Sequence, residues 1–156
     1  MRVTPLIFLC VAACGGGQPA PEAASAEQPT AGEKCIRDSN LHQPPPLDAP
    51  QRIDALHIVV KHDQVKGAIG EGVTRSREEA CLRALEAREH LIAQSDWEAT
   101  YEAYSDGKGA MKGALSNISQ TDVEEPFANA AFALEVDELS YIVESPHGFH
   151  LILRRK

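Results

Sequence analysis

The pattern of apolar and polar positions predicts two β-strands at opposite ends of the folded part of the chain. In residues 149–154, alternate side chains fall on opposite faces, which places His150 among bulky apolar neighbours. Residues 53–61 are also strand-like and carry a single histidine, His57, near their middle. Gly148 can supply the turn before the last strand, because glycine tolerates positive φ. If the two strands pair, His57 and His150 meet inside a small sheet.

Helical patterns occupy much of the chain between these strands. Ser76 with Glu79 has the spacing of a capping box, Asp96 can cap a second helix, and Pro126 can open a third. The predicted helices cover residues 78–94, 97–104 and 127–134, and shorter strands are predicted at 114–118 and 141–144. Strands at both ends with helices between them predict an α+β domain with an antiparallel sheet over residues 53–156.

The first residues have the features of an export signal. Arg2 is followed by a short apolar run, residues 6–13, that ends in small residues directly before Cys14. Val11, three positions before that cysteine, completes a pattern that resembles a bacterial lipobox. The resemblance implies removal of residues 1–13 and lipidation of Cys14, which would hold the protein at a membrane surface without a spanning helix. An ordinary signal peptide cut nearby is the alternative.

Residues 14–52 are predicted to form a flexible linker. Glycine, proline, alanine, glutamate and glutamine dominate its first half, which has no apolar periodicity. Three consecutive prolines, residues 44–46, predict a stiffer and extended segment near its end. Cys35 lies within the linker, and export would allow a disulfide with Cys81. Because Cys81 falls on the apolar face of a predicted helix, a buried free thiol is an equally good alternative.

Composition and charge exclude several classes of function. The 156 residues carry a formal net charge of −8, which argues against binding to nucleic acid or to anionic lipid by charge. No apolar run in the sequence is long enough to span a bilayer. The histidines His57, His62, His147 and His150 match no compact metal-binding motif, and no nucleophile-elbow pattern surrounds a serine. We therefore expect neither a metal site nor a hydrolase.

Four short pieces of sequence, specific in their order and spacing, resemble the parvulin class of peptidyl-prolyl cis/trans isomerases. They are Ala-Leu-His-Ile-Val-Val-Lys at 55–61, Tyr-Ser-Asp at 104–106 with Gly-Ala-Leu at 113–115, Val-Glu-Glu-Pro-Phe at 123–127 with Ala-Phe-Ala-Leu at 131–134, and Glu-Leu-Ser at 138–140 with His-Gly-Phe-His-Leu-Ile-Leu at 147–153. The resemblance covers essentially all of the folded region. It implies a four-stranded antiparallel sheet with about three to four surrounding helices.

The resemblance also implies an enzyme that needs no cofactor and breaks no bond. The residues that match its pocket for the proline ring are Leu115, Val123 and Phe127. Val123 stands where the family usually has methionine, and it is smaller but still apolar. His57 and His150 match a central histidine pair, and Ser145 matches a hydroxyl position at the pocket rim. As neutral imidazoles, the two histidines can fix each other's tautomers and tie the strands together, which is a structural role.

Three departures from the family pattern lie near the expected site. Gly107 follows Asp106 where the family commonly has Cys or Asp, so no side chain there can polarise the substrate carbonyl. Asp106 is the candidate for that catalytic role if the loop is shifted by one residue. The usual Gly-Asp-Leu-Gly is Gly-Ala-Leu-Ser at residues 113–116. Lys61 and Lys66 in an acidic domain make a poor phosphate clamp, so we expect no preference for phosphorylated Ser/Thr-Pro.

These features predict a peptidyl-prolyl cis/trans isomerase that assists the folding of exported proteins. Its partners would be unfolded or proline-containing polypeptides, and it would act as a monomer. Gly15 after the lipidated cysteine favours, by resemblance, the periplasmic side of a bacterial outer membrane. One alternative is a peptide-binding holdase with the same fold and weak catalysis, which Gly107 favours. Another is a tethered scaffold that recruits partners through its proline-rich stem.

Overall fold

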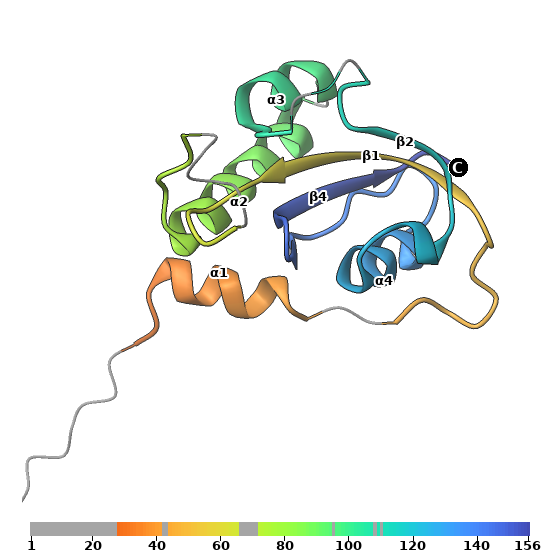
Figure 1. Cartoon of the computed structure of the whole chain (residues 1–156), viewed down its shortest axis with the longest axis horizontal. Coiled ribbons are helices and arrows are strands. Elements are labelled where there is room, and N and C mark those ends of the chain that lie inside the picture. The colour runs from red at the N-terminus through yellow and green to blue at the C-terminus, as the bar shows by residue number, and fades with distance from the viewer. Residues whose placement is uncertain (1–27, 42–43, 66–71, 95, 108, 110) are drawn as a thin grey trace, which may run out of the picture.

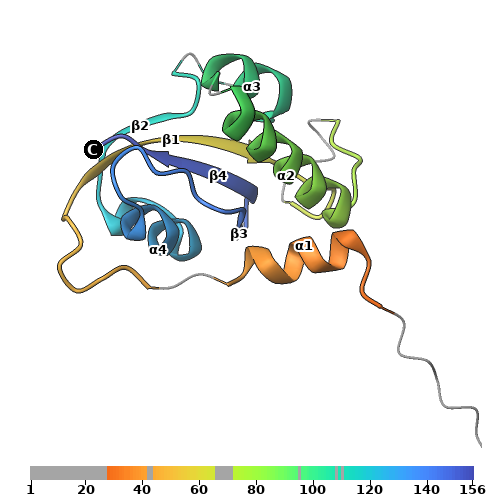
Figure 2. The same cartoon turned by 180° about the vertical axis from the view of Figure 1, so that it is seen from behind.

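The structure is a computed structural model, and it describes residues 28–41, 44–65, 72–94, 96–107, 109 and 111–156. Its centre is a four-stranded antiparallel sheet in the order β2-β1-β4-β3, seen from opposite sides in Figure 1 and Figure 2. The strands are β1 (Ile53–Val60), β2 (Ala114–Ile118), β3 (Val143–Ser145) and β4 (Gly148–Arg154). The first and last strands of the domain are therefore neighbours in the middle of the sheet.

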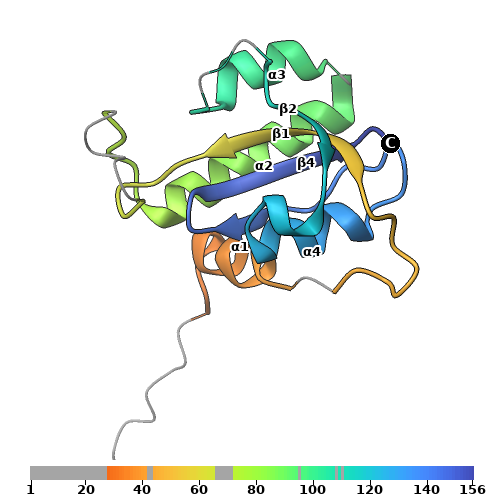
Figure 3. The ribbon, with the colours of Figure 1, turned by 45° about the vertical axis from the view of Figure 1, so that its right-hand side comes forward.

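Helices cover both faces of this sheet. The helices α2 (Arg77–Gln94) and α3 (Trp97–Tyr104) pack on one face, while the 3-10 helix η2 (Gln120–Asp122) leads into α4 (Glu125–Ala133) on the other. Figure 3 shows α2 behind the central strands and α4 in front of them. Along β4, Leu151 belongs to the core beneath α2, and Ile152 belongs to the core beneath α4. Strand alternation thus divides the buried side chains between two cores.

Two of the three predicted helix starts are confirmed in their capping contacts, whereas α4 begins at Glu125, one residue before Pro126. The helix α3 spans the predicted residues, and the Asp96 side chain accepts a hydrogen bond from the Ala99 N–H. Before α2, the Ser76 side chain accepts from the Glu79 N–H, and the Glu79 carboxylate accepts from the Ser76 N–H. These bonds satisfy amides that the first turn leaves without partners. The α+β class with a four-stranded antiparallel sheet is also confirmed.

The linker predicted over residues 14–52 differs from the structure in one segment. A helix, α1 (Ala31–Ser39), lies within it and packs against the domain instead of forming part of a flexible tether. Its start is a capping box in which Thr30 accepts from the Glu33 N–H and Glu33 accepts from the Thr30 N–H. The prediction failed because the helix has only nine residues and its attachment depends on Cys81, 46 residues further along the sequence.

A disulfide between Cys35 and Cys81 joins α1 to α2, which decides the alternative that the sequence leaves open. Both cysteines are buried. The predicted signal peptide, residues 1–13, and the predicted lipidation site Cys14 lie outside the described residues. Within the part of the chain that the structure describes, no helix has the length and apolar character needed to cross a membrane.

Candidate active site

The two central histidines meet on the face of the sheet that α4 covers. The register of β1 and β4 pairs His57 with Ile152 and Val59 with His150, so the two imidazoles are diagonal neighbours. Their Nδ1 atoms lie 3.5 Å apart, and the stacked rings have centroids 5.7 Å apart. The pair therefore connects the two middle strands through side chains as well as backbone.

A serine holds the second histidine from its other side. Ser145, at the end of β3, shares a 2.7 Å hydrogen bond between its Oγ and the Nε2 atom of His150. The His147 backbone N–H donates to the same Oγ at 3.0 Å. Gly148 makes the turn with φ of 122°, and a Cβ added there would lie 2.5 Å from the Val60 carbonyl oxygen. Both ring nitrogens of His150 thus face a polar partner.

Burial keeps this histidine pair uncharged at neutral pH. Desolvation, followed by repulsion from His57 and His147, lowers the pKa of His150 to about 3. Desolvation also lowers the pKa of His57. Neutral imidazoles can share hydrogen bonds and exclude water, but such a pair does not shuttle protons near pH 7. The buried, neutral pair therefore fits a role in shaping the site and excluding water from its floor.

An open pocket of about 480 Å³ lies over the histidine pair. Leu115, Val123 and Phe127 form its apolar wall, as the sequence resemblance implies. The Phe127 ring stands edge-on to both imidazoles, with centroids 5.6 Å from His57 and 5.4 Å from His150. Phe127 is itself buried in the core beneath α4, which fixes the position of its ring. The result is an apolar wall that stands beside the neutral pair and Ser145.

Four further residues line the pocket and are missed by the sequence reasoning. They are Thr121, Asp122, Glu124 and His147. Glu124 Oε1 lies 3.4 Å from His147 Nε2, which joins the start of α4 to the β3–β4 turn. Asp122 accepts hydrogen bonds from the backbone and hydroxyl of Ser119, and these bonds lower its pKa. Proximity to Val123 and Ser145 in the sequence is the only signal that could have identified them.

The structure does not bring the proposed catalytic Asp106 to this pocket. Its Oδ2 atom accepts from the Lys61 N–H at 2.8 Å and from Arg75 Nη1 at 2.5 Å. Its own N–H donates to the Val59 carbonyl at 2.8 Å. These bonds join the segments that follow β1 and α3, so the carboxylate serves as a structural bridge. Asp106 is not among the pocket-lining residues.

Gly107 and Gly113, both in the segment between α3 and β2, have different surroundings. At Gly113, where φ is 80°, an added Cβ would collide with the His57 carbonyl, while the His57 N–H donates to the Gly113 carbonyl at 2.8 Å. That glycine allows the loop to lie against the strand beneath the pocket. At Gly107, an added Cβ would lie 3.0 Å from a methyl of Val59. The Tyr101 hydroxyl donates to the Gly107 carbonyl at 2.5 Å and holds this part of the loop.

The apolar wall, the neutral histidine pair and the four-stranded sheet are the features that the resemblance to the parvulin class implies. A family model described as the PPIC-type PPIase domain, or rotamase, matches residues 57–156. The chain belongs to this family, the parvulin type of peptidyl-prolyl cis/trans isomerase. The resemblance inferred from four short pieces of sequence is therefore confirmed.

Known relatives agree with this assignment. The chain is 36% identical over 110 residues to the peptidyl-prolyl cis-trans isomerase pin1 of Rhizopus delemar, covering 67% of this chain and 73% of the relative. It is 30% identical over 116 residues to the peptidyl-prolyl cis-trans isomerase NIMA-interacting 1 of Theileria annulata, covering 68% and 81%. The structure of peptidyl-prolyl isomerase ESS1 from Candida albicans is similar in fold, with a TM-score of 0.62, 22% identity and coverage of 78% and 71%.

Proposed function

We propose that this protein is a membrane-tethered peptidyl-prolyl isomerase that assists the folding of exported proteins by non-covalent catalysis. The observation that carries the proposal is the apolar wall of the pocket standing against a neutral, hydrogen-bonded histidine pair. Uncatalysed X–Pro isomerisation takes tens of seconds or longer, which is slow enough to limit folding. A catalyst held outside the cytoplasm would meet exported chains before they fold.

The barrier to rotation about a peptide bond is about 18–20 kcal/mol and comes from amide resonance. A catalyst must therefore bind the twisted amide more tightly than either planar form. In the proposed mechanism Phe127, Leu115 and Val123 grip the proline ring, and removal of water from the bound amide weakens its charge-separated resonance. His150 is occupied at both ring nitrogens, so the Nε2 atom of His57 and the Ser145 hydroxyl are the groups proposed to hydrogen-bond the rotating amide without a proton transfer.

The proposed substrates are unphosphorylated X–Pro segments of unfolded polypeptides. The guanidinium of Arg75 already donates to the Asp106 carboxylate and to the Lys61 carbonyl, which commits it to structural contacts. On the pocket rim, Asp122 and Glu124 present carboxylates that would repel a phosphate. These charges favour a neutral or basic neighbour of the proline over a phosphorylated one.

The proposed location is the periplasmic side of an outer membrane, with lipid on Cys14. Support comes from the export signal and lipobox pattern of residues 1–14. The buried Cys35–Cys81 disulfide adds support, because disulfides persist mainly in oxidising compartments outside the cytoplasm. Labelling cells with an alkyne-bearing fatty acid tests the anchor. The wild-type chain should be labelled and partition with membranes, whereas the Cys14→Ser variant should do neither.

An isomerisation assay without a coupling protease tests the catalytic proposal. NMR exchange spectroscopy on X–Pro peptides, with residues 14–156 carrying Cys14→Ser, should show catalysed exchange that Phe127→Ala abolishes. Peptide shifts without catalysed exchange would instead establish the holdase alternative, which Gly107 favours because it leaves no side chain at a usual catalytic position. Absence of both binding and exchange would reject the catalytic proposal.

A further inference from the structure

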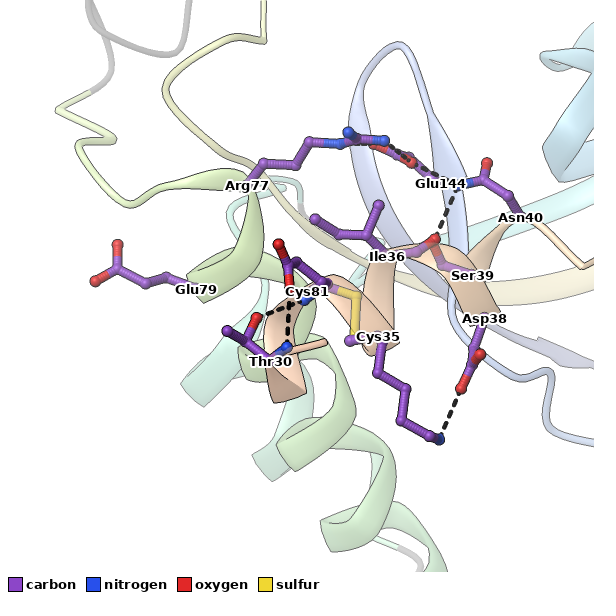
Figure 4. The surroundings of a disulfide bond; sticks show 12 residues. Thr30, Cys35, Ile36, Asp38, Ser39, Asn40, Arg77, Glu79, Cys81 and Glu144 are labelled. Atoms are coloured by element: carbon purple, nitrogen blue, oxygen red, sulfur yellow. Dashed lines mark hydrogen bonds and ion pairs between the residues drawn. A yellow bond between two sulfur atoms is a disulfide. The ribbon is translucent and has the colours of Figure 1, made fainter. Parts of the chain in front are cut away.

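The helix α1 precedes the family match at residues 57–156, yet it is firmly attached to the domain. Figure 4 shows the Cys35–Cys81 disulfide that fastens it to α2. Both cysteines are buried, at 3% and 0% exposed, and Ser39 at the end of α1 is also fully buried. The sequence separation of the two cysteines is 46 residues, so the bond joins elements that local structure would leave independent.

The far end of α1 reaches β3 through a single carboxylate. Asn40 Nδ2, at the C-cap of α1, donates to Glu144 Oε2 at 2.9 Å. Arg77, at the start of α2, donates to both oxygens of Glu144, at 2.5 and 2.6 Å. Burial would raise the pKa of Glu144, but the hydrogen bonds from Arg77 and Asn40 outweigh it and lower that pKa. Glu144 is therefore an ionised group held from two helices at once (Figure 4).

Val143 anchors β3 in the core beneath α4, and Glu144 supplies the polar contact of this strand with α1 and α2. Strand β3 has three residues, lies at the edge of the sheet and pairs only with β4. The outward-facing side of this short edge strand is held by the contacts of Glu144, and its inward-facing side by the burial of Val143. The residue after Glu144 is Ser145, whose Oγ reaches His150 and receives the His147 N–H. A shift of β3 would therefore move one side of the pocket and the partner of a central histidine.

We infer that α1, fastened by the Cys35–Cys81 disulfide, is a positioning element of the active site, and that it acts through Asn40 and Glu144. These two residues hold β3 so that the Ser145 hydroxyl stays on His150 Nε2. The inference rests on the proposed isomerase function for its kinetic consequence. The contact chain from Asn40 through Glu144 and Ser145 to His150 is independent of that function. Neither Asn40 nor Glu144 is among the pocket-lining residues, so both act through Ser145.

Three variants interrupt the series of contacts between α1 and His150 at different points. Asn40→Ala removes the contact of α1 with β3, and Glu144→Ala removes the carboxylate that binds both Asn40 and Arg77. The double variant Cys35→Ala with Cys81→Ala removes the disulfide that fastens α1 to α2. Lys34→Ala is the matched control, because it breaks the exposed Lys34–Asp38 ion pair of α1 without touching β3. Glu144→Gln tests conservative rescue, since an amide keeps an oxygen for Arg77 although it loses the charge.

The measurements are kcat/KM by NMR exchange on an X–Pro peptide and the imidazole ¹⁵N chemical shifts of His150. Both use residues 14–156 carrying Cys14→Ser. We expect the three breaking variants to lower kcat/KM by about 10-fold, because small misplacements in an active site have effects of this order or larger. The His150 ¹⁵N shifts should move in the same variants, and Glu144→Gln should recover part of both effects. Lys34→Ala should match the wild type.

Thermal unfolding of each variant separates positioning from stability alone. Assays run well below the lowest melting temperature compare fully folded proteins. If the variants melt earlier but keep wild-type kcat/KM and wild-type His150 shifts, the inference is overturned. If the wild type itself catalyses no exchange on any peptide, the proposed function fails. The His150 shifts still decide whether α1 positions β3 in that case.

Discussion

Acidification should destabilise this protein through His150 before it protonates most carboxylates. The imidazole has a pKa of about 3 in the folded chain, against an ordinary value of 6.5, because it is buried. Between these values the unfolded chain binds a proton that the folded chain does not. Stability due to this group is therefore fully present above pH 6.5 and is lost progressively as the pH falls toward the folded value.

The magnitude follows from the linkage relation. Between about pH 7.5 and about pH 5.5, the unfolded imidazole gains most of one proton, and the loss of unfolding free energy is about 1.4 kcal/mol. His57 and His62 also have lowered pKa values caused mainly by burial, and they add losses of the same sign. Carboxylates contribute little in this window because their ordinary pKa values lie lower.

A His150→Gln variant isolates the contribution of one imidazole. Glutamine cannot titrate, and its amide can still share a hydrogen bond with Ser145. Urea unfolding at both pH values, followed by the fluorescence of the single tryptophan Trp97, gives the free energies. On acidification the wild type should lose about 1.4 kcal/mol more than the variant. Equal losses in the two proteins would refute the assignment of a neutral, desolvated imidazole.

Four other substitutions test separate parts of the structure. Phe127→Ala should cost about 3–5 kcal/mol of unfolding free energy by leaving a cavity, and it should abolish catalysed exchange in the NMR assay. Gly113→Ala should destabilise by at least about 2 kcal/mol, because it combines positive φ with a backbone collision, and urea unfolding would show it. Asp106→Asn should lower the unfolding free energy by about 1–3 kcal/mol and leave kcat/KM within about 2-fold of the wild-type value. A much larger loss of kcat/KM would indicate that the carboxylate is catalytic. Changing Cys35 and Cys81 to alanine together should cost about 4 kcal/mol by chain entropy, measured as a shift in the urea midpoint, and no shift would contradict the bond.

The elements of the fold could be predicted because their signals are local. The caps of α2 and α3 use Ser76, Glu79 and Asp96, which lie within three residues of the amides they satisfy. The alternation around His57 and His150 identified the face that carries the site. The apolar wall of the pocket followed from matching short pieces of sequence to a family, since spacing alone does not bring Leu115 to Phe127.

Other features depend on contacts that the sequence does not encode locally. Asp106 looked catalytic beside the family pattern, but Arg75, 31 residues earlier, holds its carboxylate in another direction. The helix α1 was missed because its attachment depends on Cys81 and on Glu144, which is 104 residues beyond Asn40. The sequence allowed both a disulfide and a free thiol, because helical burial suits either form of Cys81.

The placement of the histidine pair has a consequence for the order in which each new molecule folds. His57 and His150 are separated by 93 residues, and the second lies on the last strand of the domain. Because synthesis begins at the N-terminus, α1 and α2 are made before β4, and the pocket cannot form until β4 is complete. Until then each new copy, with its ten prolines, is similar to the unfolded, proline-containing chains that the proposed function assigns as substrates. The population would therefore assist its own maturation.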